Sequence, residues 1–338
     1  DVKAGTVMGL MGENGAGKST MMKCLFGTYQ KDEGNIFLDG KEVSFSGPRE
    51  ALENGIAMVH QELNQCLERN VVDNLFLGRY PVNAVGVIDE GRMKKEASEL
   101  FRKLGMTVNL SQPMRNMSVS QRQMCEIAKA ISYNSKIIVL DEPTSFLDIR
   151  HKLELLTILK QMVLDHQLTV IMSLHELDLA QKISDKVICV HGEYIEKYGA
   201  PEEIFTSEYI RKLYGITRGS YNAAFGCVEM DPPRGEPQVF VIGGNGSGIP
   251  YYRKLQRQGI PFAAGVLHTN DVDCQVAGAL ADQVITEKPF ESISQESYDK
   301  AVKLMKKCQK VICPLKDFGT VNAANRELLR LARELGIL

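Results

Sequence analysis

A glycine-rich stretch near the start of the chain holds the residues best suited to bind a phosphate. The stretch "GLMGENGAGKST", from Gly9 to Thr20, fits the pattern G-x-x-x-x-G-K-[ST]. Glycines let a backbone close around a phosphate, a lysine adds a positive charge, and a serine hydroxyl can ligate Mg²⁺. The pattern predicts a nucleoside triphosphate as the ligand, and a glycine-rich turn that binds nothing is the alternative. The predicted binding residues are Gly12, Asn14, Gly15, Gly17, Lys18, Ser19 and Thr20.

Three later apolar runs each lead into polar residues that can do chemistry. Gln61 follows "GIAMVH", Asp141 and Glu142 follow "KIIVL", and His175 follows "LTVIMSL". Open α/β sheets bind ligands at the carboxyl ends of their strands, so we expect a site where these runs end. Taken singly, Glu142 would be a solvated strand end and His175 a surface histidine. Beside the phosphate loop, a functional role is favoured for both.

The flanking segments give the phosphate loop its required setting. An apolar run, Val7 to Met11, precedes it and a helical segment, Met21 to Phe26, follows it, which is the strand–loop–helix order of phosphate-binding loops. "NIFLDGKEVSF" predicts a hairpin that turns at Asp39-Gly40. From about residue 71 to residue 133 the pattern is helical, and Ser118 can cap the last helix of this region.

The composition of the sequence changes near "VEMDPPRGEPQ", where prolines cluster and the periodic pattern of apolar residues stops. We interpret residues 231–237 as a linker. Beyond it, the strand candidates "VFVIGG", "FAAGVL", "DQVIT" and "KVICPL" alternate with helical segments, which predicts a second, smaller α/β domain. Its glycine-rich "GGNGSG" at 243–248 has neither the G-x-G-x-x-G spacing nor a following lysine, so a tight turn is favoured over a regulatory ligand site.

Size and composition limit the remaining classes of protein. With 338 residues the chain suggests about two domains. A net charge of -2 gives no bulk electrostatic attraction for nucleic acid, and no apolar stretch approaches the ~20 residues of a membrane span. The chain opens with no signal peptide. Its eight cysteines are scattered without a CxxC pair, so we interpret them as reduced thiols of a cytosolic protein.

The order of these motifs resembles that of the nucleotide-binding subunit of an ABC transporter, over about residues 1–215. The series comprises the phosphate loop, Gln61, "SVSQ" at 118–121, Asp141-Glu142, "SFLD" at 145–148 and His175. Few other folds place an acidic pair, a serine-rich helix cap and a lone histidine in this order. The resemblance implies ATP with Mg²⁺ as cofactors. It also implies an α/β fold, a P-loop NTPase of ABC type with antiparallel β and helical subdomains.

By this resemblance, each residue of the series has a role. Ser19, Gln61 and Asp141 hold the Mg²⁺ shell. Glu142 is the general base for the attacking water, while His175 and Gln61 position the γ-phosphate and the water. In this family the signature helix contacts the nucleotide bound to the other subunit. The resemblance therefore implies a head-to-tail dimer with two ATP molecules at the interface, contacted by Ser118, Ser120, Gln121 and Asp148.

Two features depart from the family pattern. The usual LSGGQ signature is replaced by "MSVSQ" at 117–121, in which side chains replace both glycines that let the backbone approach phosphate. Sugar-importer ATPases often carry such a variant, and we expect slower or altered hydrolysis. The family's adenine-stacking aromatic residue lies upstream of the phosphate loop, and Asp1 begins after that point. We therefore expect an N-terminally truncated chain with weak base selectivity.

Two subfamilies share the resemblance. Residues 1 to about 140, notably "IAMVHQELNQ" and "NLFLGRYP", look like the first cassette of a simple-sugar importer ATPase. From "DEPTSFLDIRHKLELL" onward the chain looks more like an iron-siderophore or cobalamin importer ATPase with an extra C-terminal domain. The join lies at the strand that bears Asp141, where both subfamilies share sequence. The solute therefore stays open between these types.

We expect an ATPase subunit that energises a membrane importer for a small solute. It would lie at the cytoplasmic face of the membrane, bound to transmembrane permease subunits and a second ATPase subunit, and indirectly to a solute-binding protein. The alternative is a soluble ABC-type regulatory or nucleotide-binding module without a permease. The expected domains are an ABC ATPase domain over 1–230 with a helical subdomain at about 65–135, the linker 231–237, and a C-terminal Rossmann-like α/β domain over 238–338.

Overall fold

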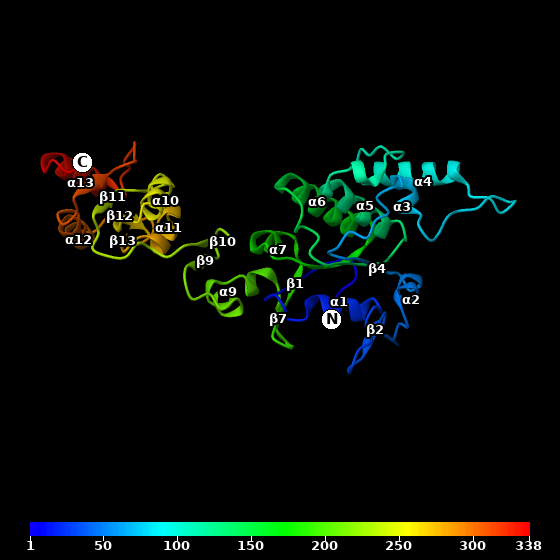
Figure 1. The fold of residues 1–338 in the computed structure, drawn as a ribbon. Helices are drawn as coiled ribbons and strands as arrows, with labels where there is room; N and C mark the ends of the chain where they lie inside the picture. Colours follow the sequence, from blue (N-terminus) through cyan, green and yellow to red (C-terminus); the bar gives the residue numbers. More distant parts are fainter. The chain divides into compact units, whose positions relative to one another are not determined.

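The computed structural model describes residues 1–338. Contacts divide the chain into two compact units, Asp1–Phe205 and Thr206–Leu338 (Figure 1). Every residue that the sequence analysis assigned to the nucleotide site belongs to the first unit. None of the helices combines the length and the apolar character needed to cross a bilayer. No disulfide joins any of the eight cysteines.

A six-stranded sheet forms the centre of the first unit. Its strands lie in the order β4 (Ile56–Val59), β5 (Ile137–Leu140), β6 (Thr169–Ser173), β1 (Val7–Gly12), β7 (Lys186–His191) and β8 (Tyr194–Gly199). Neighbouring strands are parallel except for β7 and β8. Parallel strands are buried on both faces, which explains continuous apolar runs such as "IIVL" in β5. The parallel arrangement brings the polar ends of β1, β4, β5 and β6 to one edge of the sheet.

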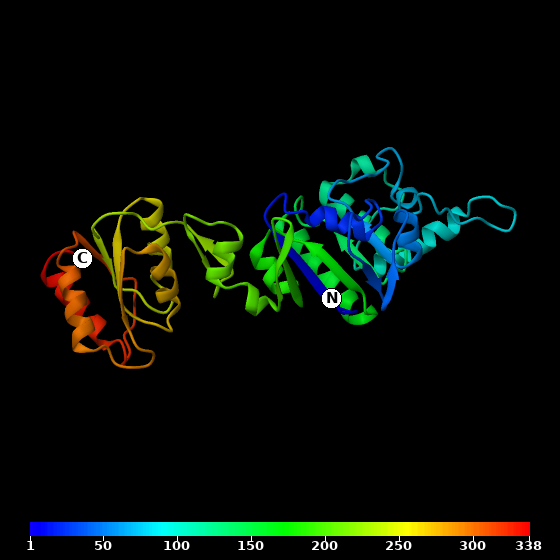
Figure 2. The same ribbon diagram turned by 90° about the horizontal axis from the view of Figure 1, so that it is seen from below.

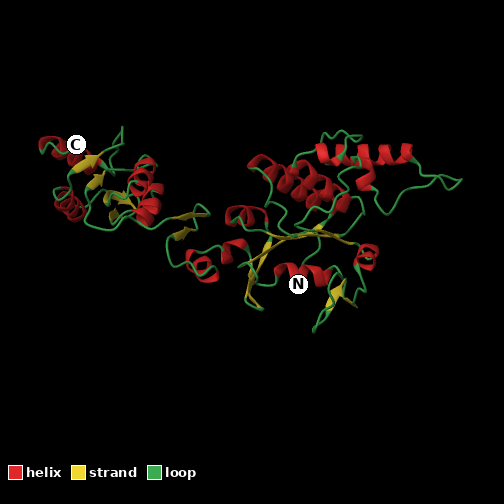
Figure 3. Ribbon diagram, viewed as in Figure 1, coloured by secondary structure: helices red, strands yellow, loops and turns green.

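Helices cover both faces of this sheet (Figures 1 and 3). On one face lie α1 (Lys18–Leu25) and α2 (Pro48–Glu53), and on the other lie α5 (Val119–Ile131), α6 (Ile149–His166) and α7 (Leu177–Ile183). Side chains of the sheet, of α1 and of α2 share one buried core, which includes Met8, Met22, Ala51, Val139 and Ile171. This core fixes α1 against the strands whose ends carry the acidic pair.

A helical region extends the first unit between β4 and β5. It contains α3 (Val71–Leu75), α4 (Glu90–Lys103) and α5. Helix α4 buries Met93, Ala97 and Phe101, which recur every four residues and so lie on one face. Ser118 caps α5 in a reciprocal capping box with Gln121, which confirms the predicted helix start.

The hairpin predicted at Asp39-Gly40 is confirmed. Strand β2 (Ile36–Leu38) pairs antiparallel with β3 (Lys41–Val43). The turn residues have φ of 50° and 77°. A type I′ turn requires positive φ at both central positions, which the Asp-Gly pair tolerates. The short helix α8 (Pro201–Ile204) ends the first unit.

The second unit centres on a parallel four-stranded sheet. Its order is β13 (Gln283–Glu287), β12 (Phe262–His268), β11 (Val239–Val241) and β14 (Lys310–Ile312). Figure 2 shows α10 (Ile249–Arg257) and α11 (Val272–Leu280) on one face, with α12 (Gln295–Met305) and α13 (Ala323–Glu334) on the other. A separate apolar cluster fills each side of the sheet. The predicted C-terminal α/β architecture is confirmed.

The division between the units falls before the proline-rich segment. Helix α9 (Ser207–Leu213) and the hairpin of β9 (Ser220–Asn222) and β10 (Cys227–Glu229) belong to the second unit. There β9 contacts α11, and Arg253 Nη2 lies 2.6 Å from Glu229 Oε1. The sequence predicts these elements to belong to the first domain, because the composition changes only at the prolines. The domain limits at 230 and 238 stay a prediction.

Candidate nucleotide site

The loop between β1 and α1 has the backbone that its glycines predict. Gly12, Gly15 and Gly17 have φ of 145°, 86° and 82°. L-residues with side chains rarely adopt such conformations. At Gly12 a Cβ would also lie 2.1 Å from the carbonyl oxygen of Val190. Only glycine fits there, so the chain can leave β1 close against β7.

The first turn of α1 is suited to an anion. The helix has no side-chain cap and no acidic residue in its own first turn, so no side chain of α1 offsets the partial positive charge of its N-terminus. Lys18 Nζ donates to the carbonyl oxygens of Gly12 and Glu13, both at 2.8 Å. Burial lowers the pKa of Lys18, and the charges of the acidic pair oppose that shift. A buried cation and a helix N-terminus thus meet in one loop, as phosphate binding requires.

Two oxygen-bearing side chains meet beside this loop. Ser19 Oγ donates to Asp141 Oδ1 at 3.0 Å, which joins α1 to the end of β5. Mg²⁺ prefers oxygen ligands and is bound through one or two carboxylates together with phosphate oxygens. The donor set of Ser19 and Asp141 fits that ion. Gln61, the third predicted ligand, donates from its amide nitrogen to Glu142, and its role as a metal ligand stays a prediction.

The three predicted catalytic residues lie together. Glu142 Oε2 accepts from Gln61 Nε2 at 2.8 Å, and Glu142 Oε1 lies 2.5 Å from His175 Nε2. Ser145 Oγ also donates to Oε2 at 3.1 Å. The side chain of Glu142 is 18% exposed, so a water molecule can reach a carboxylate that is held from two sides. This arrangement suits a general base.

Two further residues, Ser173 and Glu176, support this edge of the sheet and were not predicted from the sequence. Ser173, the last residue of β6, is buried and hydrogen bonds to the acidic pair. Glu176 accepts from Thr144 Oγ1 at 2.8 Å and from Lys152 Nζ at 2.5 Å. The available signal was a serine in the otherwise apolar run "VIMSL". A single serine does not reveal its partners, because they come from a different strand.

The residues predicted to contact a second nucleotide lie at other helix ends. Ser118 and Gln121 bond to each other in the capping box of α5. Asp148 caps α6 by accepting the N–H of His151 at 3.0 Å, and Ser120 is buried in the first turn of α5. None of their hydrogen bonds reaches the phosphate loop. Their contact with a nucleotide stays a prediction, which a single chain does not test.

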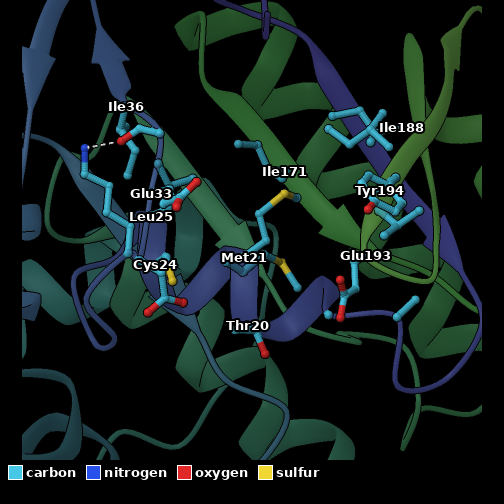
Figure 4. Close-up of a pocket in the computed structure, with 18 of the residues that line it drawn as sticks. Thr20, Met21, Cys24, Leu25, Glu33, Ile36, Ile171, Ile188, Glu193 and Tyr194 are labelled. Atoms are coloured by element: carbon cyan, nitrogen blue, oxygen red, sulfur yellow. Dashed lines mark hydrogen bonds between the residues drawn. The ribbon is translucent and has the colours of Figure 1, made fainter.

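A cavity of about 790 Å³ opens beside the phosphate loop. Figure 4 shows Thr20, Met21 and Cys24 of α1 on one side of it, with Tyr194 of β8 across from them. Aliphatic side chains such as Ile171 contribute to the remaining wall, together with the charged residues Lys31, Asp32, Glu33 and Glu193, and Tyr194 is the only aromatic residue in the lining. An apolar cavity next to a phosphate-binding loop has the character of a nucleobase site.

The glycine-rich turn of the second unit is arranged differently. Between β11 and α10, the N–H groups of Gly244, Gly248 and Ile249 all donate to the carboxylate of Asp273. Asp271 accepts a further N–H of the same turn. Burial raises the pKa of Asp273, although these N–H groups lower it in part. Carboxylates of the chain itself take the place of an anion, which favours a structural turn over a ligand site.

Comparison with known families agrees with the geometry. The family model described as "ABC transporter" matches residues 1–145, which include the phosphate loop and the acidic pair. The chain carries an ABC transporter ATP-binding domain. The resemblance stated from the sequence is thus confirmed for this domain. A second family model, described as "MJ0874 family", matches residues 262–338 of the second unit.

The ABC domain has curated relatives that are named as sugar-import proteins. The galactose/methyl galactoside import ATP-binding protein MglA of Treponema pallidum is 53% identical over 213 residues, which cover 63% of this chain and 42% of that protein. The MglA protein of Treponema denticola is 58% identical over 186 residues, which cover 55% of this chain and 37% of that protein. The chain thus spans about two fifths of the length of these relatives.

Solved structures confirm the ABC cassette fold. The protein cbiO1 of Clostridium perfringens, part of the ABC transporter complex cbiONQ, is 25% identical with a TM-score of 0.53, over 63% of this chain and 84% of that chain. The ATP-binding cassette MJ0796, in a dimeric post-hydrolysis state with ADP and Pi, is 22% identical with a TM-score of 0.53, over 60% of this chain and 88% of that one. The predicted P-loop NTPase fold of ABC type is therefore correct.

Proposed function

We propose that this chain binds and hydrolyses ATP to energise an ABC importer for a small solute. The observation that best supports this function is that the phosphate loop and the predicted catalytic residues meet at one edge of the sheet. Asp141 meets Ser19 of the phosphate loop at 3.0 Å, and the adjacent Glu142 meets Gln61 and His175. Groups that hold phosphate and a group that can activate water thus lie side by side in the ABC domain. The names of the MglA relatives, which are import ATP-binding proteins, support the same function.

In the proposed reaction the protein binds the phosphate chain, positions the catalytic carboxylate and accepts one proton from water. Lys18 and the first turn of α1 bind the phosphate chain. Ser19 and Asp141 would hold Mg²⁺, which would supply positive charge near the phosphate chain. Glu142 accepts the proton of the attacking water as a general base. Gln61 and His175 hold its carboxylate in one orientation, so the base is placed before the water arrives.

We propose a head-to-tail dimer as the working form. Ser118 and Asp148 lie at helix ends and form no hydrogen bond with the chain's own phosphate loop, which is compatible with contact to a second subunit. Large apolar residues beside them are exposed, namely Val119, Phe146 and Ile149 at 42%, 56% and 77%. Exposed apolar surface of this kind marks sites of protein association. It supports burial of this face in a dimer.

We propose a sugar as the solute class and permease subunits as membrane partners. Identities of 53% and 58% to MglA proteins carry the sugar assignment. The likeness to cbiO1 is lower, so the siderophore or cobalamin alternative from the sequence has weaker support. Binding to a permease would place the chain at the cytoplasmic face of the membrane. Co-purification with membrane permease subunits supports transport, and a chain that never associates with membranes supports the alternative of a soluble ABC-type module.

The decisive experiment replaces the proposed base. Glu142→Gln keeps the shape of the side chain and removes its capacity to accept a proton. Hydrolysis should fall by at least about 10²- to 10⁴-fold, while ATP still binds. Unsplit ATP should also hold the dimer together, which gel filtration with ATP and Mg²⁺ detects. A variant that hydrolyses ATP at the unaltered rate would exclude Glu142 as the base. A variant that binds ATP but stays monomeric would exclude the shared site.

A further inference from the structure

Ser173 hydrogen bonds to both members of the acidic pair. Its Oγ donates to Asp141 Oδ1 at 3.0 Å and accepts the backbone N–H of Glu142 at 2.8 Å. The residue has 0% exposure, so neither bond competes with solvent. A serine hydroxyl has one proton to donate and lone pairs to accept. In Ser173 one hydroxyl group therefore uses both capacities on the site.

The position of Ser173 in the sheet explains these contacts. Strand β6 lies between β5, which ends at the acidic pair, and β1, which enters the phosphate loop. Ser173 pairs in register with Leu10 of β1, and the preceding residue Met172 pairs with Leu140 of β5. The three residues before Ser173 in β6 are apolar and buried. A buried hydroxyl in such a run is costly unless it is bonded, so its two bonds explain why a polar residue is tolerated there.

The hydrogen bond that Ser173 accepts from the N–H of Glu142 stabilises an unfavourable backbone conformation at Glu142. Glu142 has φ of 47°, in the left-handed region that residues with a Cβ rarely adopt. Such a conformation persists only where surrounding contacts hold it. Here the contact on the N–H is Ser173 Oγ, at 2.8 Å. The same peptide directs the Glu142 carboxylate toward Gln61 and His175.

The bond to Asp141 supports a side chain. Asp141 Oδ1 accepts from two hydroxyls, Ser19 on α1 and Ser173 on β6, both at 3.0 Å. Two donors from different elements hold this one oxygen, and the carboxylate is 4% exposed. Loss of one donor would leave its rotation less restricted.

We infer that Ser173 is a positioning residue that couples the metal-binding carboxylate of Asp141 to the general base Glu142. It does not act on ATP itself, and it acts only through these two residues. Their catalytic roles rest on the proposed function, whereas the hydrogen bonds of Ser173 do not. The two statements can therefore fail separately.

The test uses Ser173→Ala in the full chain. Turnover, kcat, should fall about 10- to 100-fold, because small displacements of catalytic groups cost rates of that order. The Kd for ATP without Mg²⁺ should change by less than about twofold, since the phosphate loop is intact. Hydrogen–deuterium exchange at the Glu142 amide should become at least about tenfold faster. The matched control is Ser184→Ala, which removes another buried serine hydroxyl, one without a hydrogen-bond partner, and should leave all three quantities unchanged.

Conservative variants separate positioning from packing. Ser173→Thr keeps the hydroxyl and should restore slow exchange at Glu142 and most of kcat. If Ser173→Ala does not fold, Ser173→Cys, with a weaker hydrogen-bonding group of similar size, should give intermediate exchange and rate. Unaltered exchange and kcat in the Ala or Cys variant would overturn the inference. Failure of the unaltered chain to hydrolyse ATP would contradict the proposed function, and exchange at Glu142 would still decide the role of Ser173.

Discussion

The two glycine-rich turns of this chain have similar backbones and different surroundings. Gly12 and Gly17 have φ of 145° and 82°, while Gly244 and Gly246 have φ of 150° and 78°. Both turns lead from a parallel strand into a helix. In the first, Lys18 begins the helix, whose own first turn has no carboxylate. In the second, Asp273 accepts three N–H groups at the helix start.

The comparison shows that glycines supply space for an anion and neighbouring charges decide which anion fills it. A helix N-terminus attracts negative charge wherever it comes from. In the second unit α11 supplies that charge from inside the fold, so the turn is closed. In the first unit the carboxylate of Asp141 bonds to the hydroxyl of Ser19 instead, so the N–H groups of the turn remain for a phosphate.

The largest expected effect follows from the buried cation. Lys18→Ala removes the fixed positive charge from a site that would hold several negative charges, so ATP binding should be lost, with Kd raised by at least about 100-fold. Calorimetry with ATP measures it. Lys23→Ala is the matched control, because Lys23 lies on the same helix outside the loop. Unchanged affinity in Lys18→Ala would show that the first turn, like the second, is only structural.

Much of the candidate site could be predicted from the sequence. Gln61, Glu142 and His175 each follow an apolar run, and parallel strands bring such ends to one sheet edge, where the structure places the three together. The hairpin at Asp39-Gly40 could be predicted for a local reason, since both residues tolerate positive φ. Signals of this kind are carried within a few residues of sequence.

Other features depend on partners that are far apart in sequence. Nothing in "VIMSL" states that Ser173 would meet the acidic pair, 31 and 32 positions away. The closing of the second glycine turn depends on Asp271 and Asp273, which follow a different strand. The division before α9 depends on contacts of β9 with α11, whereas the sequence shows only prolines. These properties depend on tertiary contacts between distant residues, and patterns within a short stretch of sequence do not reveal such contacts.

The next largest effect is expected at the glycine-rich turn of the second unit, whose N–H groups bond to Asp273. Asp273→Asn keeps the size of a fully buried side chain and replaces a carboxylate by an amide at three N–H donors. The free energy of unfolding of the second unit should fall by about 1–3 kcal/mol. The amide oxygen can replace Oδ2, which accepts from Gly244 and Gly248, but the buried N–H of Ile249 would face the amide nitrogen and lose its acceptor. Hydrogen exchange of the amides of β11 and β12 reports this stability. Asp299→Asn on the exposed face of α12 should change it by less than about 0.5 kcal/mol. An equally small change in Asp273→Asn would mean that its carboxylate does not hold the turn.

A smaller effect is expected from removing the second glycine turn altogether. A chain shortened to residues 1–235 should bind ATP within about twofold of the full chain, because every proposed site residue lies in the first unit. A chain shortened to residues 1–205 should bind ATP with the same affinity. It should also fold more stably, because it does not contain β9 without its partner helix α11. Calorimetry on both chains measures this. Loss of ATP binding in both, despite intact folding by circular dichroism, would show that the second unit contributes to the site.

A similarly small effect is expected from the base of the nucleotide. If the phosphate loop supplies most of the binding free energy, the Kd values for ATP and GTP should differ by less than about threefold, because Lys18 and the start of α1 would contact only the phosphates. The cavity beside the loop is lined by aliphatic and charged residues, and its one aromatic residue, Tyr194, is 77% exposed (Figure 4). Competition of ATP and GTP for the same site measures the ratio. A strong preference for ATP that disappears in Tyr194→Ala would instead make Tyr194 a stacking platform, because an aromatic face can select a base where a phosphate grip cannot. A strong preference that survives in Tyr194→Ala would place base recognition outside this cavity.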